Sequence, residues 1–166
     1  MNITTKKMKM KNAIKIMMML GFFTFLSTTD IKAQDLGSSY RTAIGAKFYP
    51  GGITLKHFVN SSTALEAIGY FYNRGSRLTG LYEFHGNIGG APGLRWYIGP
   101  GAHVAFYNSK FFGGGETVGI DGVVGLDYKF RGAPINISLD WQPSFEFGDY
   151  AGFSSGWGGF AVRFTF

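Results

Sequence analysis

Apolar and polar residues alternate along most of the chain after position 40, most clearly over 135–147. In that stretch every odd position is apolar and every even position is polar. A two-residue period is typical of a β-strand that separates an apolar from a polar environment. The stretch is longer than the about 9 to 11 residues that a transmembrane β-strand needs. The pattern therefore predicts a strand of a membrane barrel that runs slightly past the lipid.

Similar alternation recurs in eight segments, which are separated by stretches rich in Gly, Pro and Asn that are typical of turns. The segments are 40–49, 53–59, 64–72, 77–85, 94–107, 117–130, 135–147 and 157–166. Together they predict an all-β fold, an eight-stranded antiparallel up-and-down transmembrane β-barrel preceded by a signal peptide. Pro100 has no N–H donor, so it predicts a bulge or a local loss of pairing in its strand.

The tight turn 131–134 predicts the register between the two segments that flank it. If Phe130 pairs with Ile135, the apolar faces of both strands coincide. Glycines then lie opposite acidic residues and leave room for their side chains, namely Gly125 opposite Asp140 and Gly119 opposite Glu146. Short turns of such barrels lie on the periplasmic side, where we expect the chain termini as well.

The first 33 residues have the pattern of a secretory signal peptide. Six lysines flank the apolar run 16–26, which is too short to cross a bilayer as a helix. The small residue Ala33 offers a cleavage point before Gln34. We therefore expect a signal peptide over 1–33 and a barrel domain over 34–166, exported to the bacterial outer membrane.

Loss of this segment changes the charge balance. Six of the 16 basic and one of the 10 acidic residues precede position 34, which leaves ten basic and nine acidic residues. This balance excludes a polybasic chain that binds nucleic acid.

Charged residues make up about 14% of 34–166, where a soluble surface carries roughly 25 to 35%. The scarcity favours a barrel that shows apolar residues to lipid. The chain has no cysteine, which excludes disulfides and thiolate metal sites.

Aromatic residues near strand ends mark the headgroup level in membrane barrels. The belt expected on the apolar faces comprises Tyr40, Phe48, Trp96, Phe106, Tyr128, Trp141, Phe147 and Phe166.

The segment 158–166 alternates apolar or aromatic residues with small or polar ones and ends in phenylalanine. It resembles the terminal strand of bacterial outer-membrane barrels. That resemblance implies that Phe160, Val162, Phe164 and Phe166 form the signal read by the barrel assembly machinery. The blocks 42–48, 78–85, 93–107, 118–130 and 134–143 carry a second resemblance. Through them residues 40–166 resemble an uncharacterised family of small bacterial outer-membrane barrels, and they are similar in architecture to the OmpA/OmpX-type barrels. The resemblance implies fold and location, and no molecular activity.

The polar faces carry six cations and six anions. Because eight strands enclose a space just wide enough for side chains, we expect these charges to be paired and to fill the lumen. The predicted lumen charge network comprises Arg41, Lys47, Lys56, Glu66, Glu83, Arg95, Asp121, Asp127, Lys129, Asp140, Glu146 and Arg163. A gated polar pathway through the same charges is the alternative.

Lipid-modifying enzymes also occur on eight-stranded barrels, so the histidines are candidate catalytic residues. Glu83 and His85 share a strand face, as an acid–base pair or a two-ligand metal site requires. His57 and His103 have no serine two residues away on their strands. The motifs G-x-S-x-G and H-E-x-x-H and the P-loop are absent. A hydrogen-bonded lumen contact is the simpler interpretation of the Glu83 and His85 pair.

The sequence thus predicts a non-catalytic, monomeric outer-membrane β-barrel without a cofactor, a structural or surface-interaction component of the cell envelope. Its expected partners are outer-membrane lipids and the barrel assembly machinery. Two alternatives stay open. One is a lipid-modifying enzyme that uses Glu83 and His85, and the other is a soluble, exported, lipocalin-like binder of an apolar ligand.

Overall fold

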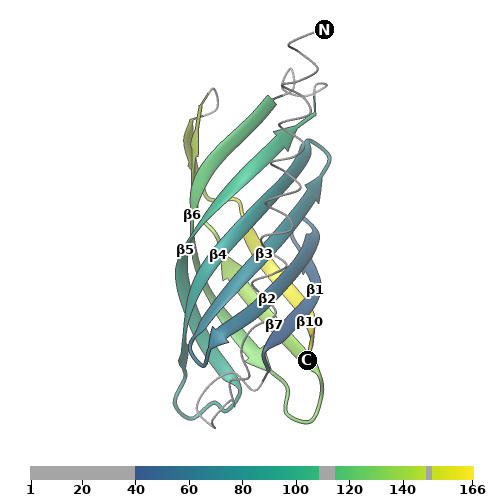
Figure 1. Ribbon diagram of the computed structural model, residues 1–166, viewed down its shortest axis with the longest axis vertical. Coiled ribbons are helices and arrows are strands. Elements are labelled where there is room, and N and C mark those ends of the chain that lie inside the picture. The colour runs from purple at the N-terminus through teal and green to yellow at the C-terminus, as the bar shows by residue number, and fades with distance from the viewer. Residues whose placement is uncertain (1–39, 109–114, 149–150) are drawn as a thin grey trace, which may run out of the picture. The chain divides into compact units, whose positions relative to one another are not determined.

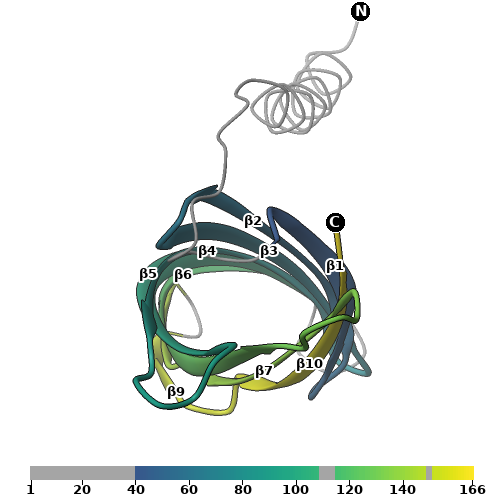
Figure 2. The same cartoon turned by 90° about the horizontal axis from the view of Figure 1, so that it is seen from below.

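The computed structural model describes residues 40–108, 115–148 and 151–166. These residues form one closed antiparallel β-barrel of eight strands (Figures 1 and 2). The strand segments are β1 (Thr42–Phe48), β2 (Gly52–Asn60), β3 (Thr63–Tyr72), β4 (Gly75–Asn87), β5 (Leu94–Tyr107), β6 (Gly115–Lys129), β7 (Ile135–Trp141), β8 (Ser144–Phe147), β9 (Gly152–Ser154) and β10 (Gly158–Thr165). The predicted eight-stranded antiparallel barrel is confirmed. The signal peptide expected over 1–33 lies outside the described residues.

Ten segments make eight barrel strands because two strands are interrupted. The predicted strand 135–147 divides into β7 and β8 at Gln142 and Pro143. Pro143 has no N–H to donate, and the Gln142 N–H donates instead to the Trp157 carbonyl, at 2.9 Å. β6 nevertheless pairs with β7 and β8 in one continuous register. The interruption is therefore local and does not shift the strand.

The last barrel strand is also longer than predicted, because β9 occupies part of the segment expected to be a loop. Gly158 follows Ser154 by four positions, whereas their partners Ser144 and Trp141 on the neighbouring strand differ by three. This extra residue is a bulge-like irregularity between β9 and β10. It lies at Trp157, whose ring packs against Tyr70 in the lumen, with the centroids 5.1 Å apart.

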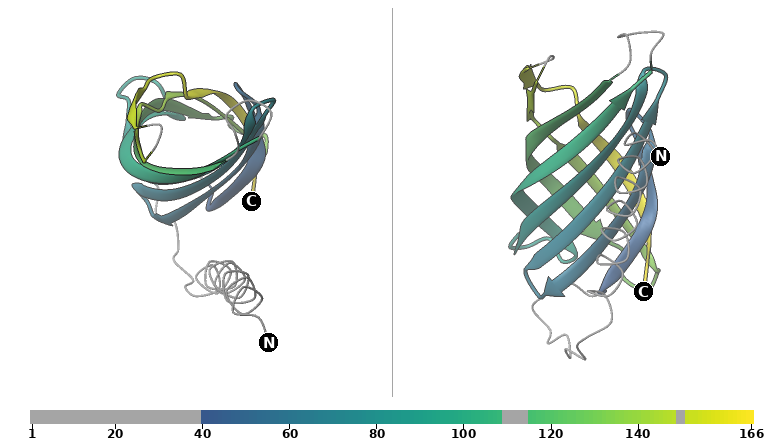
Figure 3. Two further views of the ribbon diagram at one scale, coloured as in Figure 1. Left: turned by 90° about the horizontal axis from the view of Figure 1, so that it is seen from above. Right: turned by 45° about the horizontal axis from the view of Figure 1, so that its top comes forward.

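Two pairings close the barrel. β5 pairs with β6, and β1 pairs with β10, where Thr42 and Phe166 exchange backbone hydrogen bonds of 2.9 Å in both directions. A path through register partners that starts at Ile137 passes once around the barrel and returns at Phe147, ten residues along the same strand. This stagger makes the strands tilt, as Figure 3 shows.

The register predicted from the tight turn 131–134 is confirmed. The Phe130 N–H donates to the Ile135 carbonyl at 3.1 Å. Glycines lie opposite acidic residues as expected, Gly125 opposite Asp140 and Gly119 opposite Glu146.

The short connections between β2 and β3, β4 and β5, and β6 and β7 lie at one end, with the carboxyl terminus. We call this the turn end and the opposite end the loop end (Figure 1).

Pro100 does not produce the bulge that the sequence allowed. β5 pairs with β6 without a register shift, and Pro100 lies opposite Gly122. Pairing with β4 lapses between Gly101 and Ile98 but resumes in the same register. The missing N–H of Pro100 thus costs a short stretch of pairing on one side and leaves the strand alignment intact.

The barrel exposes large apolar side chains and buries charged ones, the reverse of the usual distribution in a soluble protein. Exposed side chains include 25 large apolar residues, whereas eleven Asp, Glu, Lys and Arg side chains are buried. One expectation for the aromatic belt is wrong: Tyr40 is only 9% exposed and packs edge-on against Phe58 at 5.2 Å. Tyr40 precedes β1, so the alternation of that strand does not govern where its side chain points. In the described part of the chain, no helix is long and apolar enough to span a membrane.

Candidate functional site: the charged lumen

The buried charges form two separate networks along the barrel. The turn-half network contains four anions and four cations, and the loop-half network contains two anions, one cation and one histidine. The turn-half network comprises Lys47, Lys56, Glu66, Glu83, Arg95, Asp127, Asp140 and Arg163, and the loop-half network comprises Arg77, His103, Asp121 and Glu146. The two networks contain all ten buried members of the predicted set.

Lys56 is the centre of the turn-half network. Its ammonium lies 2.9 Å from a Glu83 carboxylate oxygen, 3.2 Å from Glu66 and 3.6 Å from Asp127. It also lies 4.2 Å from the centre of the Tyr97 ring, a cation–π contact. One cation thus joins acidic residues from β3, β4 and β6. Because a buried charge is tolerated only when paired, these contacts compensate the burial of Lys56 and of the three carboxylates.

Arg163 on β10 uses its whole guanidinium group. It donates to Glu66 at 2.5 Å, to the Thr54 hydroxyl at 3.1 Å, and to Asn136 and Ser138 at 3.2 and 2.8 Å. The planar fork of arginine suits such a set of acceptors, which a lysine ammonium does not match. Arg163 therefore connects the closing strand β10 to β2, β3 and β7 at once.

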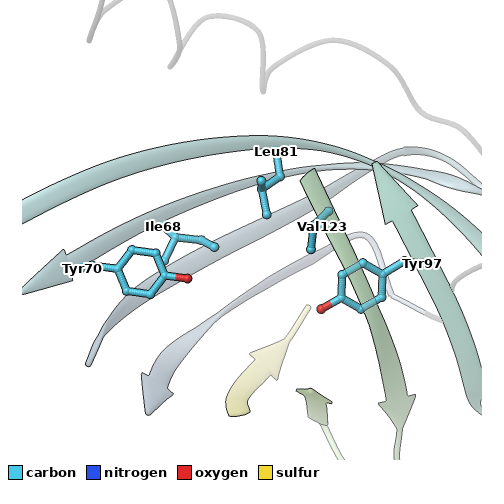
Figure 4. Packing of buried hydrophobic residues seen from close by; sticks show 5 residues of the cluster. All are labelled: Ile68, Tyr70, Leu81, Tyr97 and Val123. Carbon is cyan, nitrogen blue, oxygen red and sulfur yellow. The ribbon is translucent and has the colours of Figure 1, made fainter. Parts of the chain in front are cut away.

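Asp140 carries a second chain of contacts toward the middle of the lumen. Its carboxylate accepts from Lys47 at 2.5 Å, from the Tyr97 hydroxyl at 2.7 Å and from the Gln142 amide at 3.0 Å. The Gln142 oxygen in turn accepts from the Tyr70 hydroxyl at 2.8 Å. Figure 4 shows the Tyr70 and Tyr97 hydroxyl groups directed into the interior.

The loop-half network surrounds His103. One ring nitrogen lies 2.9 Å from an Asp121 oxygen and the other lies 2.8 Å from a Glu146 oxygen. Arg77 forms ion pairs with both acids, at 3.3 Å to Glu146 and more closely with Asp121. The Arg77 guanidinium stacks 4.1 Å from the Trp157 ring.

An apolar layer of Ile68, Leu81 and Val123 lies between the two networks. On β4 and β6 these residues fall between the charged residues of the two halves, and Tyr70 and Tyr97 pack with them in one buried cluster (Figure 4). Trp157 packs against the cluster. Across the lumen, between Asp140 and Glu146, lie the buried polar residues Gln142 and Ser144. The residues between the two networks are therefore uncharged, apolar on one wall and polar on the other.

Two predicted network members lie elsewhere, at the turn end. Arg41 and Lys129 are half-buried, and the Lys129 ammonium donates to the carbonyl oxygens of Phe130 and Ala133 at 2.8 and 2.6 Å. The lysine thereby closes the turn between β6 and β7. Arg95 is buried at this end as well, and donates to the Ser61 carbonyl at 2.9 Å.

The Glu83 and His85 pair is in contact, with 2.9 Å between the His85 Nε2 atom and a Glu83 oxygen. His85 is held on both sides by rings, stacked on Tyr97 at 5.0 Å and against Phe58 at 4.8 Å. Within the ranges 40–108, 115–148 and 151–166, no group of three or more His, Cys, Asp or Glu is arranged to hold a metal ion. The packing favours a structural contact.

Sequence reasoning missed several lumen residues. Arg77 is absent from the predicted network although it shares the inward face of β4 with Glu83, and His103 was weighed only as a candidate catalytic residue. Counting every charged residue on the inward face would have found Arg77. The inward positions of Tyr70, Tyr97 and Gln142 follow from strand parity, but their hydrogen bonds depend on the opposite barrel wall.

Comparison with protein-family models, with curated proteins and with solved structures finds no match for this chain.

Proposed function

We propose that this chain is a non-catalytic, integral outer-membrane β-barrel that acts as a structural or surface-interaction component of the cell envelope. The observation that carries the proposal is the inverted distribution of side chains, with large apolar residues outside and paired charges inside. In water that arrangement exposes apolar area and buries charges, both of which are unfavourable. In a bilayer the same outer surface contacts lipid hydrocarbon. Closure of the barrel lets neighbouring strands hydrogen-bond all around, so no open strand edge is exposed to lipid.

The proposed lumen is a side-chain plug rather than a channel. Both halves hold ion pairs, and the apolar layer of Ile68, Leu81 and Val123 lies between them. An ion that crossed would have to break paired charges and pass apolar side chains, and both steps are costly. Single-channel recording in planar bilayers is expected to stay silent, and stable conductance steps would overturn the plug.

The two alternatives receive less support. A lipocalin-like carrier needs its apolar faces inward to hold an apolar ligand, and here exposed residues such as Leu139 and Ile98 face outward. A lipid-modifying enzyme needs Glu83 and His85 to reach substrate, and His85 is packed between aromatic rings.

The test combines membrane fractionation with heat-modifiable migration on a gel. We expect the protein in the outer-membrane fraction, with unheated and boiled samples migrating differently because a closed barrel resists detergent until heated. Recovery in the soluble periplasmic fraction without detergent would refute membrane insertion. For the enzyme alternative, an altered lipid A mass spectrum on deletion of the gene would overturn the non-catalytic proposal.

A further inference from the structure

The turn half of the lumen carries more positive than negative charge, because Lys129 and Arg131 lie at its end in addition to the four anions and four cations of the turn-half network. Of the seven acidic residues in the described chain, six are buried in the two networks, and the other, Glu116, is exposed at the loop end. The turn end carries Arg95, Lys129 and the exposed Arg131. Figure 2 looks into this end of the barrel.

Arg95 is the residue with unused hydrogen-bonding capacity there. It is 7% exposed, and its Nη2 group donates to Ser61, but Nε and Nη1 have no hydrogen-bond partner in the described chain. Buried guanidinium N–H groups without acceptors are costly. These two groups belong to a planar fork of donors, the geometry with which arginine binds oxyanions.

Asp127 lies directly opposite Arg95 on β6 and attracts it, but forms no direct ion pair with the guanidinium. Asn136 and Tyr40 donate to the Oδ1 atom of Asp127 at 2.8 and 3.5 Å. The Oδ2 atom lies 3.6 Å from the Lys56 ammonium and accepts no hydrogen bond from the described chain. Across residues 40–108, 115–148 and 151–166, no carboxylate comes within 4.0 Å of Arg95. The Nε and Nη1 groups of Arg95 therefore have neither a direct ion pair nor a hydrogen bond from the described chain.

Lys129 adds a second cation beside Arg95. Arg95 pairs in register with Asp127, so Lys129 is the diagonal neighbour of Arg95 on the same inward face. Such diagonal neighbours lie about 7–8 Å apart and long side chains can reach across. The ammonium has three donors, and the turn carbonyls of Phe130 and Ala133 accept from it. An oxyanion at Arg95 would thus lie in the field of a second cation.

We propose that the turn-end mouth is a phosphate-binding site in which Arg95 supplies the direct hydrogen bonds and Lys129 supplies additional positive charge. The shared chemistry is a phosphate group, which can belong to a phospholipid headgroup of the adjacent leaflet or to a free periplasmic ion. Only the headgroup source rests on the proposed membrane location, because free phosphate would bind the barrel in detergent equally well.

The test uses the purified full barrel and its variants, each first checked for heat-modifiable migration. Binding of inorganic phosphate is measured by calorimetry in a zwitterionic detergent. Retention of phosphatidylglycerol over phosphatidylcholine is measured by native mass spectrometry. Arg95→Gln is expected to weaken binding about tenfold or more, because charge-assisted hydrogen bonds are lost. Arg95→Lys keeps the charge without the fork and is expected to fall between the Arg95→Gln variant and the native barrel.

Arg74→Gln is the matched control, since it removes one positive charge at the loop end of the barrel. Binding of inorganic phosphate identifies a free-ion site, and selective retention of phosphatidylglycerol alone identifies a headgroup site. A folded barrel that binds neither probe overturns the proposal, as does an equal loss in the Arg74→Gln control. Recovery of the native chain in the soluble fraction would instead contradict the proposed membrane location, and the phosphate measurement on the folded barrel would still decide the site.

Discussion

Arg163 offers the most direct test of the idea that the lumen is packed and dry. In Arg163→Met the side chain remains long and unbranched but loses the donors to Glu66, Thr54, Asn136 and Ser138. The Glu66 carboxylate, fully buried, then keeps Lys56 at 3.2 Å as its only cationic partner in the described chain. Breaking a buried ion pair from one side costs about 3–5 kcal/mol, so we expect a loss of that size.

The double variant Arg163→Met with Glu66→Gln separates charge from shape. Removal of both charges restores the equality of anions and cations in the turn-half network, and the new amide oxygen on β3 still accepts hydrogen bonds. Coupling energies of contacting residues reach about 3 kcal/mol, so the double variant should recover roughly half or more of the lost stability. The matched control Arg131→Met removes an exposed cation and should change stability by less than about 0.5 kcal/mol.

The assay is reversible urea unfolding of the barrel in phospholipid vesicles, followed by tryptophan fluorescence. The free energy of unfolding in water and the slope with urea are both extracted. A loss below about 1 kcal/mol for Arg163→Met would contradict the reasoning, since it would mean that water screens Glu66 in the lumen. A double variant no more stable than the single one would show that lost packing, not an unpaired charge, sets the cost.

Three further predictions concern the outer surface, the strand contacts and assembly. Leu139→Arg should destabilise the vesicle-inserted barrel by about 2–4 kcal/mol, because this exposed residue midway along its strand would face hydrocarbon. A change under about 0.5 kcal/mol would contradict membrane insertion. Gly99→Ala should destabilise the barrel by about 1–3 kcal/mol in the same assay, because its new Cβ would meet the Tyr82 carbonyl. The control Gly80→Ala has open space around its new Cβ and should be nearly neutral. Equal effects of the two substitutions would contradict this packing. Phe166→Ser should reduce the amount of barrel assembled in cells several-fold, measured by immunoblot of outer membranes. The free energy of unfolding of the refolded protein should change by less than about 1 kcal/mol, since the ring is exposed. Undiminished assembly would refute a role of Phe166 in an assembly signal.

The strand pattern of this barrel was predictable because the two-residue period is local. From Ile135 onward each residue alternates between two faces, and a slip by one residue would turn every side chain around. The turn 131–134 then aligned Gly125 with Asp140, as the structure confirms. Three positions departed from prediction: Tyr40 lies before β1, where alternation does not apply, Pro143 has no N–H to donate between β7 and β8, and an extra residue lies near Trp157.

The sequence by itself determined the strand count, the antiparallel order, the register at the tight turn and the face on which most of the charged residues lie. Those features depend on alternation and turn chemistry between neighbours along the chain. Only the tertiary structure decided that Lys56 joins three strands, that His103 bridges Asp121 and Glu146, and that Arg95 retains two donors. Partners across a barrel are set by closure, stagger and the reach of side chains, and no local period encodes those quantities.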